Sequence, residues 1–206
     1  LQTAMNELSN HDHSRFLTRT NRRVGRMNTL GSDAASQGID KGVMREAVVM
    51  QMTWVGAPTV YYGDEAGMVG WTDPDNRRSY PWGKQDWELI EFHKDMIRIH
   101  KKYECFRSGS YKSIASGSHW ICYGRFNKKL QAVILINNRR ETLTVDLPIW
   151  QIGILENACL KRVVQTTQST YNVGEVMERA EDGILHVTVG PQTASVYIAA
   201  RNVEEN

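Results

Sequence analysis

Apolar residues recur at helical spacing in two stretches of the first half of the chain. The first stretch covers residues 43–54 and ends before Gly56-Ala57-Pro58, because proline cannot continue a helix. The second covers residues 87–103, and Asp86 can cap its start. The apolar stripe expected on the first helix is Val43, Ala47, Met50 and Trp54. The face expected to be buried on the second helix is Leu89, Phe92, Met96, Ile99 and Tyr103.

Short strand-like runs precede each of these helices. Residues 3–9 predict a strand that opens into a polar loop, and residues 59–62 predict a strand buried on both faces because they contain little polarity. Residues 18–42 are irregular and read as a long loop, which is a length usually associated with function or mobility. The order strand, helix, strand, helix predicts two βα units.

The hydrophobic pattern changes after about Phe106, where apolar and polar residues alternate at every second position. Strands are expected around residues 120–123, 132–136, 143–147 and 185–189, with turn residues such as Asp182-Gly183 between them. Short alternating strands at this spacing predict an antiparallel β-sandwich. We therefore expect one domain over residues 1–105, a second over 106–206, and a frayed tail at 203–206.

Composition narrows the class of protein only slightly. A chain of 206 residues suits one or two domains, and a net charge of +2 does not indicate a nucleic-acid partner. No run of about eighteen apolar residues is present, so no transmembrane helix is predicted. The three cysteines, Cys105, Cys122 and Cys159, have no CxxC spacing, which predicts free thiols and favours a reducing, cytoplasmic location.

Two polar blocks carry the candidate chemistry. The first, residues 8–16, places His11 and Asp12 directly after the predicted first strand, with Arg15 three positions beyond the aspartate. The second covers residues 56–82 and contains Tyr61-Tyr62-Gly63-Asp64-Glu65, followed by Asp73-Pro74-Asp75-Asn76-Arg77-Arg78. A histidine and a carboxylate at a strand end can hydrogen-bond to adjacent hydroxyl groups, and the carboxylate can stabilise a developing positive charge.

Together these blocks resemble the C-terminal part of the α-amylase family of glycoside hydrolases, most closely its neopullulanase and cyclomaltodextrinase branch. The resemblance covers about residues 6–107 and extends more loosely to Arg201. It implies a fold class of α/β plus all-β: the last two βα units of a TIM barrel, followed by the antiparallel sandwich. A complete (β/α)8 barrel takes about 250 residues, so the chain is expected to begin inside a barrel.

The resemblance also implies an activity and a set of site residues. Family members are retaining enzymes, and the expected substrates are starch-derived oligosaccharides or cyclodextrins with α-1,4- or α-1,6-glucosidic bonds. By motif match, Asp12 is the carboxylate that stabilises the transition state, and His11 is its partner. Asp73 and Arg77 match residues beside the reactive sugar, Arg15 is a further substrate-binding candidate, and a plain loop salt bridge remains the alternative for the Asp73–Arg77 pair.

The nucleophile and the acid/base of a retaining mechanism are expected before Leu1, so we predict that this chain alone is inactive. Asp64 and Glu65 are not expected to replace them, because adjacent residues on an extended strand point to opposite faces. No cofactor or metal is expected within these residues, although calcium in the complete enzyme is left open. The expected partner is an α-glucan, without nucleic acid or membrane, and a homo-oligomer is left open.

Two other classes compete with this hypothesis. One is a non-enzymatic amylase-like scaffold, which would be expected to have lost the His11–Asp12 pair. The other is a carbohydrate-binding module formed by the sandwich, which has few candidate aromatics. His13 departs from the threonine common after His-Asp in the branch. Two roles remain open for three aromatic residues, stacking on sugars or packing in the protein: Trp71, Tyr80 and Trp82. For the four arginines of the long loop, a solvated loop is favoured over a phosphate site: Arg19, Arg22, Arg23 and Arg26.

Overall fold

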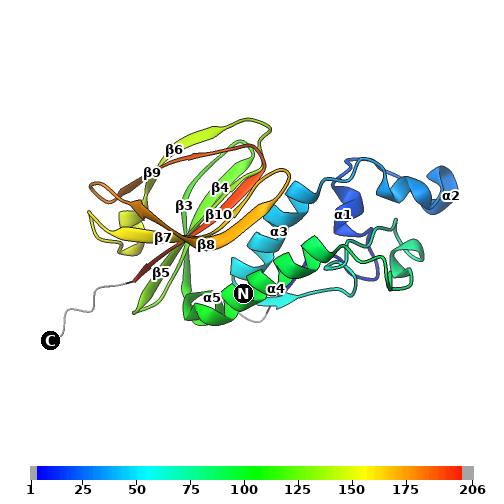
Figure 1. The fold of residues 1–206 in the computed structure, drawn as a ribbon, viewed down its shortest axis with the longest axis horizontal. Coiled ribbons are helices and arrows are strands. Elements are labelled where there is room, and N and C mark those ends of the chain that lie inside the picture. The colour runs from blue at the N-terminus through cyan, green and yellow to red at the C-terminus, as the bar shows by residue number, and fades with distance from the viewer. Residues whose placement is uncertain (1–3, 201–206) are drawn as a thin grey trace.

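A computed structural model describes residues 4–200 of the chain. The molecule is elongated, with a large β-sheet at one end, two long helices beside it, and a region of loops and short helices at the other end (Figure 1). Residue 3 of the predicted first strand and the predicted tail at 203–206 lie outside the described residues.

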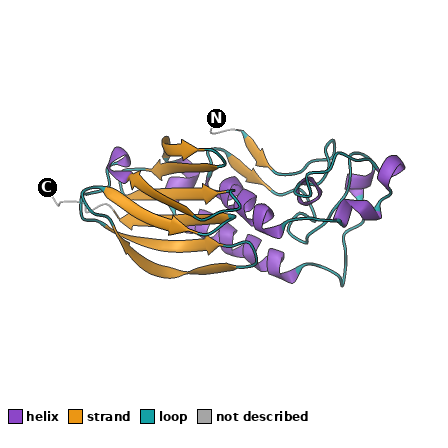
Figure 2. Ribbon diagram, turned by 90° about the horizontal axis from the view of Figure 1, so that it is seen from above, coloured by secondary structure: helices purple, strands orange, loops and turns teal. Residues whose placement is uncertain are grey.

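Two short strands form a parallel pair near the middle of the molecule, apart from the large sheet (Figure 2). They are β1 (Met5–Glu7) and β2 (Ala57–Thr59), in a register that joins Met5 to Ala57 and Glu7 to Thr59. Because the strands run in the same direction, the loops that follow them leave from the same edge. The polar residues that follow β1 and β2 therefore start from one edge of the strand pair.

The second predicted strand is wrong in two respects. β2 ends at Thr59, where the prediction began, and residues 62–67 form turns. No residue of β2 is fully buried, and Tyr62 is exposed. The reason is a contact distant in sequence: the rings of Tyr61 and Tyr62 stack on the guanidinium of Arg15 instead of continuing the ladder.

The loop predicted over residues 18–42 holds three short helical turns. They are α1 (Phe16–Arg19), α2 (Met27–Leu30) and the 3-10 turn η1 (Asp33–Ser36). The segment then enters α3 (Lys41–Thr53), whose first turn is capped by Asp40, since its Oδ1 accepts a hydrogen bond from the Val43 amide at 3.2 Å. Most of residues 20–42 thus remains irregular between these turns.

The two long helices start and end close to their predicted positions. α4 (Trp87–Lys102) is capped by Asp86 as expected, and all five residues of its predicted face are buried. α3, however, buries a neighbouring stripe that contains Met44, Val48 and Met52, whereas the predicted stripe is only half-buried. A short helix, α5 (Glu104–Ser108), follows α4 and leads into the large sheet.

The second half of the chain forms an antiparallel six-stranded sheet and a separate antiparallel pair. The order in the large sheet is β3-β4-β5-β10-β7-β8, and the pair is β6-β9. The strands are β3 (Ser110–Gly117), β4 (Trp120–Phe126), β5 (Leu130–Asn137), β6 (Leu143–Pro148), β7 (Cys159–Thr166), β8 (Tyr171–Arg179), β9 (Ile184–Val189) and β10 (Thr193–Ala200). All four predicted strand regions are strands, and the turns η2 (Asp75–Arg77) and η3 (Ile149–Ile152) complete the fold.

Alternate residues of the central strands face two different hydrophobic cores. On β5, Ile134 packs toward helices α3 and α4, while Leu135 packs toward β6, β9 and η3. The helices, the large sheet and the β6-β9 pair therefore form three successive layers. Because the first core contains residues from both halves of the chain, such as Phe92 and Val196, the helices and the sheet share one interior.

Candidate functional site

The two polar blocks meet at the carboxyl edge of the β1-β2 pair. Asn76, which is fully buried, joins them: its side-chain Nδ2 donates to the carbonyl oxygens of Asn10 at 3.2 Å and His13 at 2.8 Å. The loop after β1 and the loop that carries η2 are thus held against each other although more than sixty residues separate them in sequence.

Asn10 shapes the turn that carries His11 and Asp12. Its Oδ1 accepts hydrogen bonds from the amides of Asp12 at 2.9 Å and His13 at 3.1 Å, which is an Asx-type turn. The Nε2 atom of His11 lies 3.4 Å from Oδ1 of Asp12, and the two side chains are 60% and 68% exposed. This hydrogen-bonded turn therefore presents an imidazole and a carboxylate to solvent.

Arg15 lies beneath this turn as a buried brace. Its Nε donates to the Asn76 carbonyl at 2.9 Å, and its Nη1 donates to Oδ1 of Asp64 at 3.1 Å. The guanidinium carbon also lies 4.1 Å from the ring centre of Tyr61 and 4.6 Å from that of Tyr62. Because its side chain is 0% exposed, the prediction that Arg15 touches substrate directly does not fit this packing; its contacts position both loops.

Asp64 is the buried partner of Arg15. Burial raises the pKa of its carboxyl, while the hydrogen bond from Ser9 and the charge of Arg15 oppose that rise. Asp64 and Glu65 lie in a turn and not on a strand, so the prediction that strand alternation separates their side chains is wrong. The pairing of Asp64 with Arg15 gives a separate reason not to expect it to attack a substrate.

Asp73 and Arg77 form an exposed pair beside the Asp12 turn. Arg77 Nε donates to Oδ1 of Asp73, and the two side chains are 48% and 54% exposed for Arg77 and Asp73 respectively. This hydrogen bond is the main reason that the pKa of Arg77 is raised, and the charge of Asp12 raises it further. The charge of Asp12 therefore acts on the Asp73–Arg77 pair, and we refer to His11, Asp12, Asp73 and Arg77 together as the cluster.

A second set of buried polar contacts fixes the 71–78 loop. Asp75 accepts the Trp71 amide at 2.8 Å, and Arg78 donates to both of its carboxylate oxygens at 3.0 and 2.8 Å. The roles of Asp75 and Asn76 were not predicted, although both residues lie within the Asp73–Arg78 motif. Their acidic and amide side chains beside a proline turn were the available signal.

The aromatic residues of this region divide into two groups. Trp71 is 2% exposed and its indole nitrogen donates to the Gly31 carbonyl at 3.1 Å, so it packs rather than faces solvent. Tyr80 and Trp82 have ring centres 4.6 Å apart, and Trp82 is 80% exposed. Trp82 therefore offers an open aromatic face to solvent.

The described residues contain no group of three or more histidine, cysteine, aspartate or glutamate side chains arranged to hold a metal ion. Within residues 4–200, no helix is long and apolar enough to cross a membrane. The cluster instead combines a carboxylate, an imidazole and a carboxylate–guanidinium pair. These groups suit a ligand rich in hydroxyls that develops positive charge.

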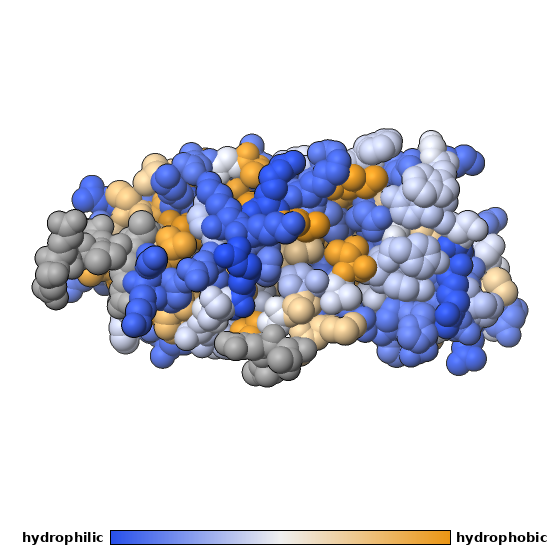
Figure 3. All heavy atoms as spheres, turned by 90° about the horizontal axis from the view of Figure 1, so that it is seen from below, coloured by the Kyte–Doolittle hydropathy of each residue, from blue (hydrophilic) through white to orange (hydrophobic). Residues whose placement is uncertain are grey.

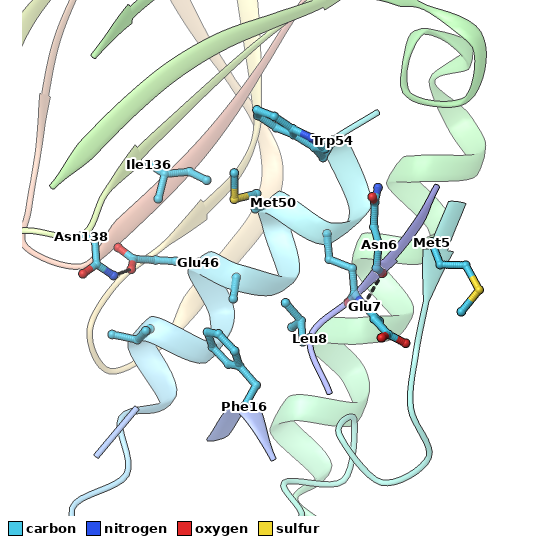
Figure 4. Close-up of a pocket in the computed structure, with 13 residues that line it drawn as sticks. Met5, Asn6, Glu7, Leu8, Phe16, Glu46, Met50, Trp54, Ile136 and Asn138 are labelled. Carbon is cyan, nitrogen blue, oxygen red and sulfur yellow. Dashed lines mark hydrogen bonds between the residues drawn. The ribbon is translucent and has the colours of Figure 1, made fainter. Parts of the chain in front are cut away.

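A separate groove of about 520 Å³ lies between α3, β1 and the end of β5 (Figure 4). The half-buried stripe of α3 lines this groove together with Leu8 and Phe16. The face of α3 that was predicted to be buried therefore faces the groove. Glu46 lies at one side and accepts a hydrogen bond from Asn138. On the face of the molecule seen in Figure 3, further apolar patches are divided by polar side chains.

Catalytic groups of barrel enzymes stand at the carboxyl ends of parallel strands, which is where this cluster lies. A family model for the α-amylase catalytic domain matches residues 2–139. Neopullulanase 2 of Thermoactinomyces vulgaris is 33% identical over 74% of this chain and 24% of its own length. Cyclomaltodextrinase of Thermoanaerobacter pseudethanolicus is 34% identical over 76% of this chain and 25% of its own length.

The solved structures agree with these relatives. An Anoxybacillus α-amylase superposes with a TM-score of 0.75 at 25% identity, and the match covers 99% of this chain and 39% of that enzyme. The chain belongs to the α-amylase family. It spans about a quarter of the length of the two curated relatives named above.

Proposed function

We propose that this chain is the C-terminal part of a retaining α-glucan hydrolase that acts on starch-derived oligosaccharides or cyclodextrins. The observation that carries the proposal is the joining of the Asp12 turn to the Asp73–Arg77 loop through Asn76, at the carboxyl edge of a parallel strand pair. The names of the relatives, neopullulanase and cyclomaltodextrinase, support the same class of substrate.

In this proposal Asp12 stabilises the transition state. Glycoside hydrolysis passes through an oxocarbenium-like state that is short of electrons, so a carboxylate held in place interacts with it more strongly than with the neutral sugar. The Asn10 turn supplies the fixed position, since the Asp12 backbone is hydrogen-bonded before any ligand arrives. His11, next to Asp12, donates to or accepts from a sugar hydroxyl.

Asp73 and Arg77 would orient the sugar beside the reacting bond. A carboxylate accepts and a guanidinium donates, so together they can fix the direction of two neighbouring hydroxyls. Both side chains are about half exposed, and the charge of Asp12 acts on Arg77. Arg15 would act indirectly, by holding both loops at their present separation.

The two groups that break the bond, a nucleophile and a proton donor, are proposed to lie outside these 206 residues. We therefore expect the purified chain to show no turnover of soluble starch, pullulan or cyclodextrins. The measurement is release of reducing ends, with a complete cyclomaltodextrinase as the positive control. Turnover that co-purifies with the 206-residue chain would contradict the proposed division of the active site.

Cytoplasmic location remains a prediction, as does the domain boundary at residue 105.

A further inference from the structure

The arginine-rich loop before α3 borders an open hollow of about 420 Å³ next to the proposed glucan site, and Val24, Gly25 and Trp71 form part of its lining. Three guanidinium-bearing side chains and three hydroxyl-bearing side chains line it, and its lining contains no carboxylate. They are Arg19, Arg23, Arg26, Ser14, Thr29 and Thr72. The sequence pattern favoured a solvated loop for these arginines, whereas the fold gathers three of the four around one space.

Packing beneath the loop holds the hollow in shape. Gly25 lies so close to the side chain of Leu30 and to the ring of Trp71 that an added Cβ would meet them at 2.5 and 3.0 Å. Trp71 in turn is buried, and its indole nitrogen donates a hydrogen bond to the Gly31 carbonyl. The hollow therefore has a fixed aromatic floor, on which the arginine loop rests.

Hydrogen bonds place two of the three arginines. Arg19 donates from Nη2 to the Leu8 carbonyl, and Arg23 donates from Nη1 to Oε1 of Gln37 at 3.2 Å. Within residues 4–200, none of Arg19, Arg23 and Arg26 has a carboxylate oxygen within 4.0 Å of its nitrogens, whereas Arg15, Arg77 and Arg78 each have one. Asp64 acts electrostatically on Arg19. The three positive charges nevertheless share one wall and repel one another, so an anion placed between them would relieve that repulsion.

We propose that this hollow is a subsite for a tetrahedral oxyanion, namely a phosphate ester carried on an α-glucan that crosses the Asp12 cluster. Guanidinium groups bind phosphate oxygens through paired N–H donors, and the hydroxyls of Ser14 and Thr72 add further donors. Position links the hollow to the glucan site, because Ser14 follows Asp12 by two residues and Thr72 directly precedes Asp73. The glucan part of this inference rests on the proposed function.

The first test uses inorganic phosphate and does not depend on the sugar. Amide resonances of the full chain are followed by NMR during a phosphate titration at constant ionic strength, for the parent chain and for the double variant Arg23→Gln/Arg26→Gln. We expect saturable shifts at Ser14 and Thr72, and at least a fivefold weaker dissociation constant in the double variant.

Arg22→Gln is the matched control, because Arg22 belongs to the same loop and carries the same charge but does not line the hollow. It should change the dissociation constant less than twofold. Absence of saturable shifts, or an equal loss in the Arg22 variant and the double variant, would overturn the proposed subsite.

The second test separates the anion from the glucan. Binding of maltotriose 6-phosphate is compared with that of maltotriose and of inorganic phosphate. Tighter binding of the phosphorylated sugar than of either probe supports the complete proposal. In a different outcome, phosphate binds and its binding requires Arg23 and Arg26, but the phosphorylated sugar binds no more tightly than inorganic phosphate. That result supports the oxyanion site and counts against the proposed glucan function. Equal binding of maltotriose and its phosphate ester overturns the subsite alone.

Discussion

At the scale of single residues, the cluster separates exposed side chains from the buried ones that place them. His11, Asp12, Asp73 and Arg77 are open to solvent, whereas Asn76 is enclosed. The sequence motif identified the exposed residues because the chemistry of these side chains is evident from the residue type alone. The buried residues were either not predicted or predicted to have another role. Their burial depends on contacts with residues far away in sequence, which a local motif does not reveal.

The Asp73–Arg77 pair gives a prediction for a complete enzyme that contains this chain. Asp73→Ala and Arg77→Ala should each lower kcat/KM on maltooligosaccharides and cyclodextrins by about tenfold or more, because a charged hydrogen bond contributes roughly 1.5–3 kcal/mol. Steady-state kinetics measures the effect. Arg98→Ala, which removes an exposed arginine paired with Asp95 on α4, is the control and should leave kcat/KM unchanged. Normal kinetics in both site variants would reduce the pair to a loop salt bridge.

Glu46 gives a prediction about stability and pH. Burial raises the pKa of its carboxyl from 4.5 to about 8, although the hydrogen bond from Asn138 lowers it in part. The folded chain therefore holds a proton that the unfolded chain releases, and the free energy of unfolding should fall as pH rises from about 4.5 to about 8. The effect is on the order of a few kcal/mol.

Glu46→Gln tests this linkage, since glutamine keeps the shape but does not ionise. Its unfolding free energy, measured with urea, should decline less between pH 5 and pH 8 than that of the parent chain. Glu141→Gln, at an exposed position, should keep the parent's pH dependence. A parallel decline in all three proteins would show that Glu46 does not titrate in this range.

At the scale of elements, periodicity predicted the long helices and the strands of the second half better than the strands of the parallel pair. α4 followed its pattern because one face is covered by the sheet. α3 did not, since both its neighbouring stripes are apolar and only packing decides which is covered. β2 ended early because Arg15, 47 residues before Tyr62, draws the tyrosines out of the strand. A contact of that kind leaves no local signal.

The joining of the two loops by Asn76 predicts a local effect on protection. Asn76→Ala should speed hydrogen exchange at the amides of Asp12 and His13 by about tenfold, because losing a buried hydrogen-bonding group costs about 1–3 kcal/mol and frees the turn. Amides of β5 and β10 should keep their rates. Asn172→Ala on exposed β8 is the control. Unchanged exchange at Asp12 would show that the Asn10 turn stands without Asn76.

At the scale of the whole molecule, one core joins the helices to the large sheet, while the parallel pair and the α3 groove remain uncovered on one side. This arrangement agrees with the proposal that the chain supplies part of a larger barrel. The site follows the same division. In this account the chain brings the carboxylate that stabilises charge and the pair that orients the sugar, and the rest of the enzyme brings the groups that break the bond.

The most direct measurement joins this chain to the preceding part of a cyclomaltodextrinase and compares the chimera with its Asp12→Asn variant. Asparagine keeps the shape and the Asn10 turn but removes the charge. We predict a loss in kcat on cyclodextrins of about 10²- to 10³-fold, as is typical when one fixed electrostatic group is removed, with an unchanged melting temperature. An active chimera whose turnover is the same with Asp12 and with asparagine at that position would contradict the account.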